Sequence, residues 1–225
     1  MTSFQSIDII QLKGSECFTF LNNQAISKIE PASAITCSYS SICNPKGRIL
    51  FSFFVILHKN QIEIAINNTM SEELLMYLNM RRFRMDVQIE RLDGKTLCMI
   101  EGGIKKNQYP LVVCDKSTDS TSEEIWPTLF SWGLPFITKS YQEKHIPQHV
   151  NLDQLNVIDF KKGCYPGQEI IARLHFLGEV KKRMQLIHVN PNNTEEPNTP
   201  VNGKIVWCSD AHEIDGKHLR QAVVS

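Results

Sequence analysis

The chain has 225 residues, and its 24 Lys and Arg balance 24 Asp and Glu, so the formal net charge at pH 7 is zero. A neutral chain has no overall field that attracts nucleic acid or an anionic membrane. Hydrophobic residues make up 42% and charged residues 21%, which is ordinary for a globular protein of one or two domains.

The N-terminus lacks the basic-then-apolar order of a secretion signal. The longest nearly apolar run, 49–57, is shorter than the roughly 20 residues that a membrane-spanning helix needs. Seven cysteines are scattered along the chain and no two form a C-x-x-C pair, a pattern typical of reduced thiols in a core. We therefore expect a cytoplasmic protein with no membrane partner.

The first half of the chain predicts mainly strands. Apolar patterns bounded by turn residues place them at 4–12, 36–43, 48–57, 61–66, 85–92 and 95–101. Turn residues at 44–47 and at Asp93-Gly94 predict two hairpins. Ser15 is expected to cap a short helix, and Thr69 with Glu72 has the capping-box spacing that opens a second one.

The second half predicts two loops, a helix and a strand-rich end. Polar residues at 115–124 indicate an exposed loop, and 147–153 is also loop-like. Apolar residues at helical spacing predict a helix from Gln168 to Gly178. After one strand beyond Met184 we expect only two short ones, at 204–208 and 219–224. Strands and helices mix without regular βαβ alternation, which favours an α+β fold.

Cys164 lies in the stretch 161–178, KKGCYPGQEIIARLHFLG, just before the predicted helix. Gly163 and Gly167 allow a tight turn around it. The amides of a helix N-terminus and two nearby lysines, Lys161 and Lys162, favour a thiolate there. The residues alone leave two interpretations open, a reactive thiol and a buried thiol that only packs.

Residues 162–169, KGCYPGQE, followed by Ala172-Arg173, resemble the signature K-G-C-Y-x-G-Q-E-x-x-[AS]-R of the YgfZ family. These are folate-binding proteins implicated in iron–sulfur cluster assembly and repair, and relatives of the glycine-cleavage aminomethyltransferase (T-protein). Outside the motif, the resemblance includes LKGSECFTFLNNQ at 12–24, CNPKGR at 43–48, the G-x-P at 133–135 and the PQ…NLD at 147–153. Order and spacing agree from residue 4 to about residue 183.

The resemblance implies an α+β, aminomethyltransferase-like folate-binding fold around a central hole, with a shortened C-terminal β-barrel segment. Residues 1–183 would form the folate-binding region, divided into 1–58 with 133–183 and 59–132. Residues 184–225 would form the partial β segment. The implied cofactor is tetrahydrofolate or a derivative, and the shortened end leaves open whether it still binds.

The resemblance also implies how the site works. Cys164 would carry the chemistry in an accessory factor that acts with iron–sulfur enzymes or cluster-assembly proteins, with no stable metal site of its own. Any link to tRNA would be indirect, through cluster-dependent modifying enzymes, with no direct nucleic-acid contact. The turn would be positioned by the other motif residues, Lys162, Gly163, Tyr165, Gly167, Gln168, Glu169 and Arg173.

Folate contacts are expected from Asn44, Lys46, Arg48 and Tyr165. Lys46 and Arg48 follow a turn and suit the carboxylates of the glutamate tail, although a solvated turn explains them equally well. Tyr165 either stacks on the pterin or packs against its own helix. Glu169 and Arg173 stand four apart, as in an ordinary helix ion pair.

Two alternative functions are a folate-dependent one-carbon transferase and a folate-binding module in which Cys164 only packs. The enzymes carry N-x-x-G-G-I-x-D-D at the first hairpin, where this chain reads NPKGRILFS with Phe51 and Ser52 at the acidic positions. Neither side chain accepts a proton as a carboxylate does. Ser131 likewise replaces the glutamate of R-L-E-A-G. His145 and His149 have a metal-like spacing, but Pro147 between them would break the helix it requires.

Overall fold

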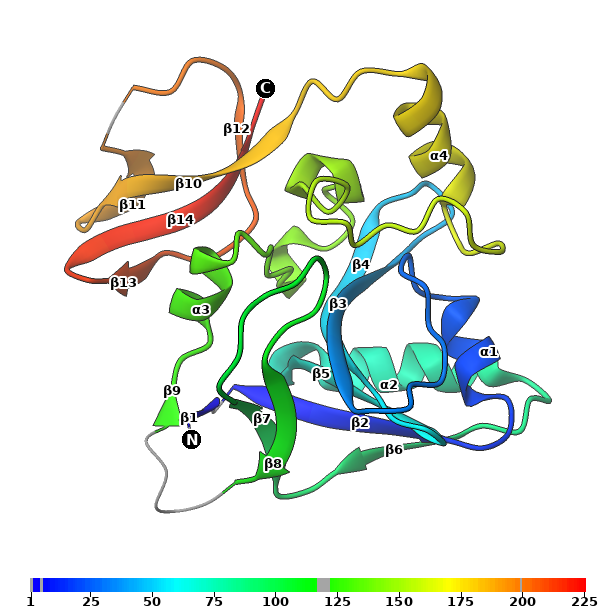
Figure 1. Ribbon diagram of the computed structural model, residues 1–225. Helices are drawn as coiled ribbons and strands as arrows, with labels where there is room; N and C mark the ends of the chain where they lie inside the picture. Colours follow the sequence, from blue (N-terminus) through cyan, green and yellow to red (C-terminus); the bar gives the residue numbers. More distant parts are fainter. Residues whose placement is uncertain (1, 5, 117–121, 199) are drawn as a thin grey trace.

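The computed structural model describes residues 2–4, 6–116, 122–198 and 200–225 (Figure 1). The described residues form three sheets and four α-helices. Two of the sheets are antiparallel, and the third is mixed because β1 and β9 run parallel. The strands and helices do not alternate in a regular βαβ order. This arrangement confirms the predicted α+β class.

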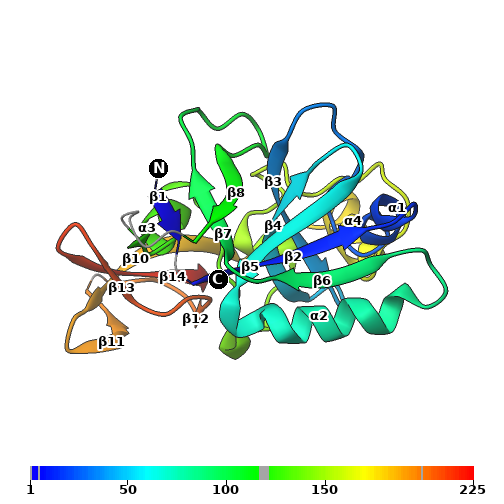
Figure 2. The same ribbon diagram turned by 90° about the horizontal axis from the view of Figure 1, so that it is seen from below.

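The largest sheet has five antiparallel strands in the order β3-β4-β5-β2-β6. Their bounds are β2 Ile7–Lys13, β3 Thr36–Cys43, β4 Ile49–Leu57, β5 Gln61–Asn67 and β6 Gln88–Leu92. Helices α1 (Cys17–Asn22) and α2 (Asn68–Arg82) lie beside this sheet (Figure 2). The predicted strands over 36–43, 48–57 and 61–66 are confirmed to within a residue or two.

Strand β4 is apolar apart from Ser52 because both of its faces are covered. Phe54 and Ile56 point into one core cluster, whereas Phe53 and Val55 point into the other. Alternate side chains of a strand face opposite sides of a sheet, so a strand buried on both sides reads as a continuous apolar run. The expectation of a buried strand rather than a membrane segment is borne out, and no helix among the described residues is long and apolar enough to cross a membrane.

Both predicted helix caps differ from the structure. Ser15 does not cap α1; its amide and its hydroxyl both donate to Asp86, the latter at 2.7 Å. Helix α2 is capped by Asn67, whose side-chain oxygen accepts the Thr69 amide at 2.8 Å. Asn and Asp are as good as Ser and Thr at these positions, so a sequence with several such residues leaves the choice open.

The second sheet has the order β8-β7-β1-β9. Its strands are β1 Thr2–Phe4, β7 Lys95–Met99, β8 Leu111–Asp115 and β9 Ser122–Glu123. The hairpin predicted at Asp93-Gly94 is wrong, because β6 pairs with β2 whereas β7 pairs with β1 and β8. The turn at Gly94, with φ 68°, carries the chain from one sheet to the next.

A disulfide joins Cys98 of β7 to Cys114 of β8, with Cα atoms 5.9 Å apart. The expectation that all seven cysteines are reduced is therefore wrong for this pair. The remaining five are free thiols. Part of the expected loop at 115–124 lies outside the described residues, and its end forms strand β9.

Helices and turns fill the stretch between the second and third sheets. Helix α3 (Trp126–Ser131) precedes two 3-10 turns, η1 (Lys139–Tyr141) and η2 (Pro147–Val150). The loop expected at 147–153 thus contains a helical turn, which begins at proline because the ring already has a helical φ. Helix α4 (Gln168–Leu177) and its stop at Gly178 confirm the predicted helix.

The third sheet has five strands rather than the expected three. Its members are β10 Arg183–Asn190, β11 Asn193–Pro197, β12 Ile205–Trp207, β13 His212–Ile214 and β14 Lys217–Val224. Strands β10 and β14 pair along six residues each, and β11 and β13 are short partners attached through tight hairpins. Polar sequence hides such edge strands because the pairing is made by the backbone.

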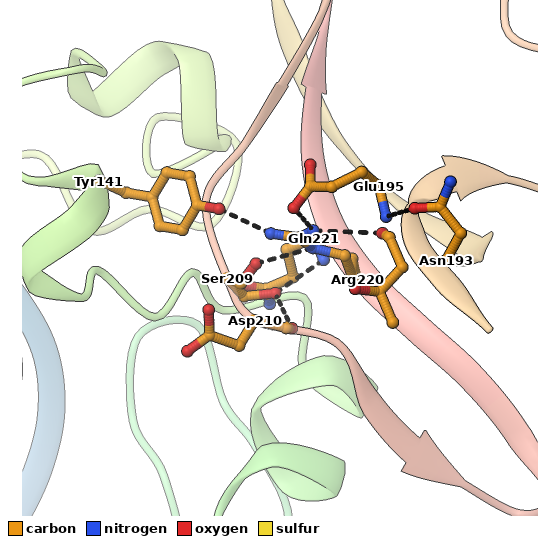
Figure 3. Close-up of polar contacts among 8 residues, drawn as sticks. Tyr141, Asn193, Glu195, Ser209, Asp210, Arg220 and Gln221 are labelled. Carbon is orange, nitrogen blue, oxygen red and sulfur yellow. Dashed lines mark hydrogen bonds and ion pairs between the residues drawn. The ribbon is translucent and has the colours of Figure 1, made fainter. Parts of the chain in front are cut away.

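Two neighbouring residues of β14 attach this sheet to the rest of the chain, and Figure 3 shows the contact of the first, Arg220, with Tyr141. The buried Arg220 donates to the Tyr141 hydroxyl at 2.6 Å and to Glu195 at 2.5 Å. The Gln221 side chain donates to the carbonyl of Leu134 and accepts the Phe136 amide at 3.1 Å. The side chains of Arg220 and Gln221 therefore both attach the C-terminal sheet to the stretch 134–141.

The apolar core is continuous across this contact. Met184, Cys208, Leu219 and Val223 belong to the same cluster as the buried residues of the first two sheets. Strands β5 and β6, from the stretch 59–132, also share a sheet with β2. The division into 1–183 and 184–225, with its two subregions, stays a prediction.

Candidate functional site

The turn before α4 depends on one glycine. Gly167 has φ 81°, and a Cβ there would lie 2.6 Å from both the Asn44 carbonyl oxygen and the Gly47 Cα. The turn closes where the Gln168 amide donates to the Tyr165 carbonyl at 3.2 Å. Gly163, by contrast, has open space around it. The turn of residues 162–167 is thus pressed onto the first hairpin at its C-terminal end.

Cys164 is exposed in the middle of this turn. The other free cysteines of the described residues, Cys17, Cys37, Cys43 and Cys208, are all buried. Burial raises the pKa of Cys37, Cys43 and Cys208 far above the usual range for a thiol. Since the thiolate is the reactive form, Cys164 is the free thiol that a reagent in solvent can reach.

The half-buried Lys162 side chain lies at the start of the turn. Its ammonium donates to three backbone carbonyls, those of Asn22 at 2.5 Å, Ala25 at 2.7 Å and Ser27 at 2.7 Å. An ammonium has three donors, so all of them are used and none is left for Cys164. Burial lowers the pKa of Lys162 to about 8, against the opposing effect of the Asp159 charge.

Tyr165 points into the core beneath this lysine. It is only 6% exposed, and its ring centre lies 5.3 Å from the Lys162 Nζ. Its buried hydroxyl has no hydrogen-bond partner among the described residues, and burial raises the pKa of that hydroxyl well above its usual range. Of the two interpretations, the geometry favours a packed tyrosine.

A cavity of about 1050 Å³ opens beside the turn, between β3, the loop 105–108, the segment 153–161 and the end of α4. Drug-sized ligands occupy pockets of comparable size. The lining residues are Ser27, Lys28, Thr36, Ser38, Leu57, Lys105, Lys106, Asn107, Gln108, Asp153, Asn156, Val157, Ile158, Asp159, Phe160, Lys161, His175 and Phe176. All of them precede the C-terminal sheet.

The cavity rim is rich in cations. Lys28, Lys105, Lys106 and Lys161 are all exposed there, and only Lys28 has an ion-pair partner among the described residues, Glu30 at 2.9 Å. Side chains of this kind attract a ligand that carries carboxylates. Sequence reasoning missed them because the lysines come from three separate segments.

Two aspartates line the cavity, but only one is free to meet a ligand. Asp153 accepts a bidentate pair of hydrogen bonds from Arg183, at 2.6 and 2.9 Å. The half-buried Asp159 accepts one backbone bond, from Lys161 at 2.8 Å, and has unused acceptor capacity. A carboxylate in this position can bind an amino-substituted heterocycle.

Three aromatic side chains, Phe160, His175 and Phe176, line one side of the cavity. The rings of Phe160 and His175 stack with centroids 3.7 Å apart and planes 12° from parallel, and Phe176 meets both edge-on. With Leu57 and Ile158 nearby on the lining, the cavity offers apolar surface for a flat ring. A pterin, its aryl ring and its carboxylate tail therefore fit the kinds of side chain present.

The residues predicted to contact folate lie elsewhere. Asn44 accepts the amides of Lys46 and Arg48 at 3.0 Å each, which fixes the hairpin turn, and Arg48 donates to the Lys144 carbonyl. Neither these three residues nor Tyr165 are among the described residues that line the cavity. Their role as folate ligands stays a prediction.

The remaining predicted positions are placed as follows. Glu169 and Arg173 are both exposed on α4, and no ion pair joins them in the described part of the chain. Gln168 reaches the Lys162 carbonyl at 3.5 Å. His145 and His149 lie buried or half-buried, and the described residues contain no cluster of three or more metal-binding side chains.

Comparison with known proteins identifies relatives along most of the chain, although no family model matches it. The "tRNA-modifying protein YgfZ" of Vibrio atlanticus is 28% identical over 182 residues, which cover 75% of this chain and 52% of that protein. This chain thus spans about half of the length of that relative. The "Iron-sulfur cluster assembly factor IBA57 homolog, mitochondrial" of Dictyostelium discoideum is 43% identical over 83 residues, 35% of this chain and 20% of its own.

Among solved structures, the glycine cleavage system aminomethyltransferase T from Bartonella henselae superposes with a TM-score of 0.69. The match covers 99% of this chain and 77% of that one at 12% identity, so it describes the fold alone. The motif at 162–169 and several YgfZ proteins among the relatives support a place in the YgfZ family, and the chain has an aminomethyltransferase-like fold.

Proposed function

We propose that this chain is a tetrahydrofolate-binding accessory factor in iron–sulfur cluster assembly or repair, and that Cys164 supplies its reactive thiol. The observation that carries the proposal is the position of Cys164. It is the exposed free cysteine of the described residues, and it follows three residues after Lys161 on the cavity lining. A thiol and a ligand cavity thus share one segment of chain.

The cavity residues support folate as the ligand. Lys105, Lys106 and Lys161 would hold the carboxylates of the glutamate tail, and Asp159 the amino-substituted edge of the pterin. Phe160 and His175 would cover the ring. When bound, tetrahydrofolate would supply a reduced pterin whose ring nitrogens can act as donors.

Cys164 would exchange with a disulfide or ligate iron transiently while a partner protein supplies the other ligands. One thiolate is too few for a resident cluster, which needs about four ligands. The partners would be iron–sulfur enzymes or cluster-assembly proteins, in keeping with the name of the Dictyostelium relative. A link to tRNA, as in the name of the Vibrio relative, would then run through cluster-dependent enzymes in the cytoplasm.

The surroundings of Phe51 and Ser52 argue against one-carbon transfer. Phe51 packs in the core with its ring 5.4 Å from that of Tyr77. The Ser52 hydroxyl is buried and accepts the Ile137 amide at 3.1 Å. Neither position offers a carboxylate to a ligand, so the accessory role is the better supported one.

Calorimetry with tetrahydrofolate tests the binding half of the proposal. We expect binding by the wild type, weakened several-fold in a Lys105→Met/Lys106→Met variant because two exposed charge pairs are lost, each typically worth about 0.2–1 kcal/mol. Lys46→Met is the matched comparison at the hairpin. A loss of affinity in Lys46→Met alone would place the tail at the hairpin instead, and no binding by the wild type would refute the proposal.

Complementation tests the thiol. In a strain that lacks its own homologous gene, the wild-type chain should restore the activity of cluster-dependent enzymes, and Cys164→Ala should not, at equal protein levels. Because Cys164 is exposed, its truncation should leave stability within about 0.5 kcal/mol of the wild type. Full restoration by Cys164→Ala would show that the thiol only occupies space.

A further inference from the structure

The Lys162 ammonium joins two parts of the chain that are distant in sequence. Its three acceptors are the carbonyls of Asn22, at the end of α1, and of Ala25 and Ser27, in the segment that follows. Lys162 itself begins the turn that holds Cys164. A compact ammonium with three donors suits three converging carbonyls, which the planar fork of an arginine cannot reproduce.

The segment that accepts these bonds is also a wall of the cavity. Ser27 and Lys28 line it on one side, and Asp159, Phe160 and Lys161 line it next to the turn. The Ile26 carbonyl accepts the Asp159 amide at 3.0 Å, so the two walls are joined by backbone as well. The Ser27 hydroxyl is fixed to that of Ser40 at 2.7 Å.

The other end of the turn is fastened away from the cavity. Gly167 packs on the hairpin at Asn44 and Gly47, which are not lining residues among those described. Between the two anchors, Gly163 has open space around it and Cys164 is exposed. Movement of the cavity wall can therefore reach the thiol through Lys162, while the hairpin end stays in place.

We propose that Lys162 is a positioning residue that couples the cavity to Cys164. A ligand that changes the position of the wall at Ser27 and Lys28 changes the turn, and with it the access to the thiol. This inference rests on the proposed function, because it takes tetrahydrofolate as the ligand. A coupling free energy between the cavity and Cys164 has to act in both directions, so a change at either site alters the other.

The test measures alkylation of Cys164 by iodoacetamide, followed by mass spectrometry of its peptide, with and without saturating tetrahydrofolate. Because the other free cysteines of the described residues are buried, the exposed thiol gives a separate signal. In the wild type we expect the ligand to change the rate about five-fold or more, the lower end of typical coupling. In Lys162→Met the ligand should bind but leave the rate nearly unchanged.

Lys181→Met, which removes an exposed lysine after α4, is the control and should respond as the wild type does. If Lys162→Met does not fold, Lys162→Arg keeps the charge without the converging contacts and should also lose the response. The affinity for tetrahydrofolate provides a second readout, because alkylation of Cys164 should change this affinity in the wild type and should leave it unchanged in Lys162→Met.

The outcomes separate this inference from the proposed function. An equal change of rate in Lys162→Met and in the wild type would mean that the ligand shields the thiol directly, which overturns the coupling and leaves folate binding intact. Calorimetry that detects no tetrahydrofolate binding to the wild type would refute the proposed function and this inference with it.

Discussion

Gly167 shows how a single backbone position holds the thiol-bearing turn. Its φ of 81° suits glycine, and a side chain there would meet backbone atoms of Asn44 and Gly47 at 2.6 Å. Backbone atoms cannot rotate away as a flexible side chain would. The turn and the first hairpin are therefore in contact at a site where a methyl group has no space.

Gly167→Ala should consequently destabilise the protein by about 1–3 kcal/mol, the usual cost of a strained backbone position, or more if the hairpin is displaced. Gly163→Ala is the matched control, because a Cβ there meets nothing within 4 Å and its effect should stay within about 0.5 kcal/mol. Urea unfolding of both variants checks this prediction. Equal midpoints would mean that the turn can detach from the hairpin at little cost.

The sequence made the residues of the thiol-bearing turn recognisable, but not their separate roles. Gly163 and Gly167 bracket Cys164 alike in sequence, and only the contacts of the fold distinguish them. Lys161 and Lys162 are neighbours in sequence. Lys161 lines the cavity, whereas the Lys162 ammonium donates hydrogen bonds to carbonyls of a segment about 140 residues earlier. Cavity residues such as Asp159 and Lys105 converge only after folding, so local patterns did not indicate them.

At the scale of elements, strands with an apolar side-chain pattern of their own were predicted well. Strands that form only by backbone pairing with a neighbouring strand were not. The apolar run of β4 and the helical spacing of α4 are local features. The turn at Asp93-Gly94 was recognised, but a turn signal does not say that the strands on either side pair with each other. Strands β11 and β13 exist because long neighbours accept their backbone bonds.

The disulfide between β7 and β8 leads to a prediction at this scale. Cys98 and Cys114 close a loop with a sequence separation of 16, and closing a loop of that size stabilises a fold by about 3 kcal/mol through the unfolded chain. Oxidised protein should therefore melt at a higher temperature than protein kept in dithiothreitol. A Cys98→Ser/Cys114→Ser variant should melt low in both conditions. A wild type insensitive to the reductant would indicate that the bond contributes nothing.

At the scale of the whole molecule, the buried His145 and the half-buried His212 lie where the C-terminal sheet meets the rest of the chain. His145 is 2% exposed and hydrogen-bonded to the backbone of Trp207 in β12. His212 of β13 stacks on Trp126 of α3 with centroids 4.0 Å apart. In both rings Nε2 is buried without a hydrogen-bond partner among the described residues. A proton added there would create a buried and unpaired charge.

Burial lowers the pKa of His145 and of His212 to about 4, with the Arg220 charge adding to the effect at His212 and Asp210 opposing it. The unfolded chain would titrate near the ordinary value of about 6.5. Between these two values the unfolded state binds more protons than the folded state, so stability is lost as the pH falls from about 6.5 to 4. For His145, the more deeply buried ring, the loss amounts to about 2–3 kcal/mol.

Acid should therefore loosen the contact between the C-terminal sheet and the core before it unfolds the first two sheets. Hydrogen exchange at pH 7 and pH 4.5 should show lost protection first in β12 and β13, because His145 and His212 contact the residues of these strands and their neighbours. His145→Asn should reduce the pH dependence of the free energy of unfolding, whereas His188→Asn, at an exposed position of β10, should leave it unchanged. A uniform loss of protection along the chain, or an unaltered pH dependence in His145→Asn, would contradict a contact that is controlled by these rings.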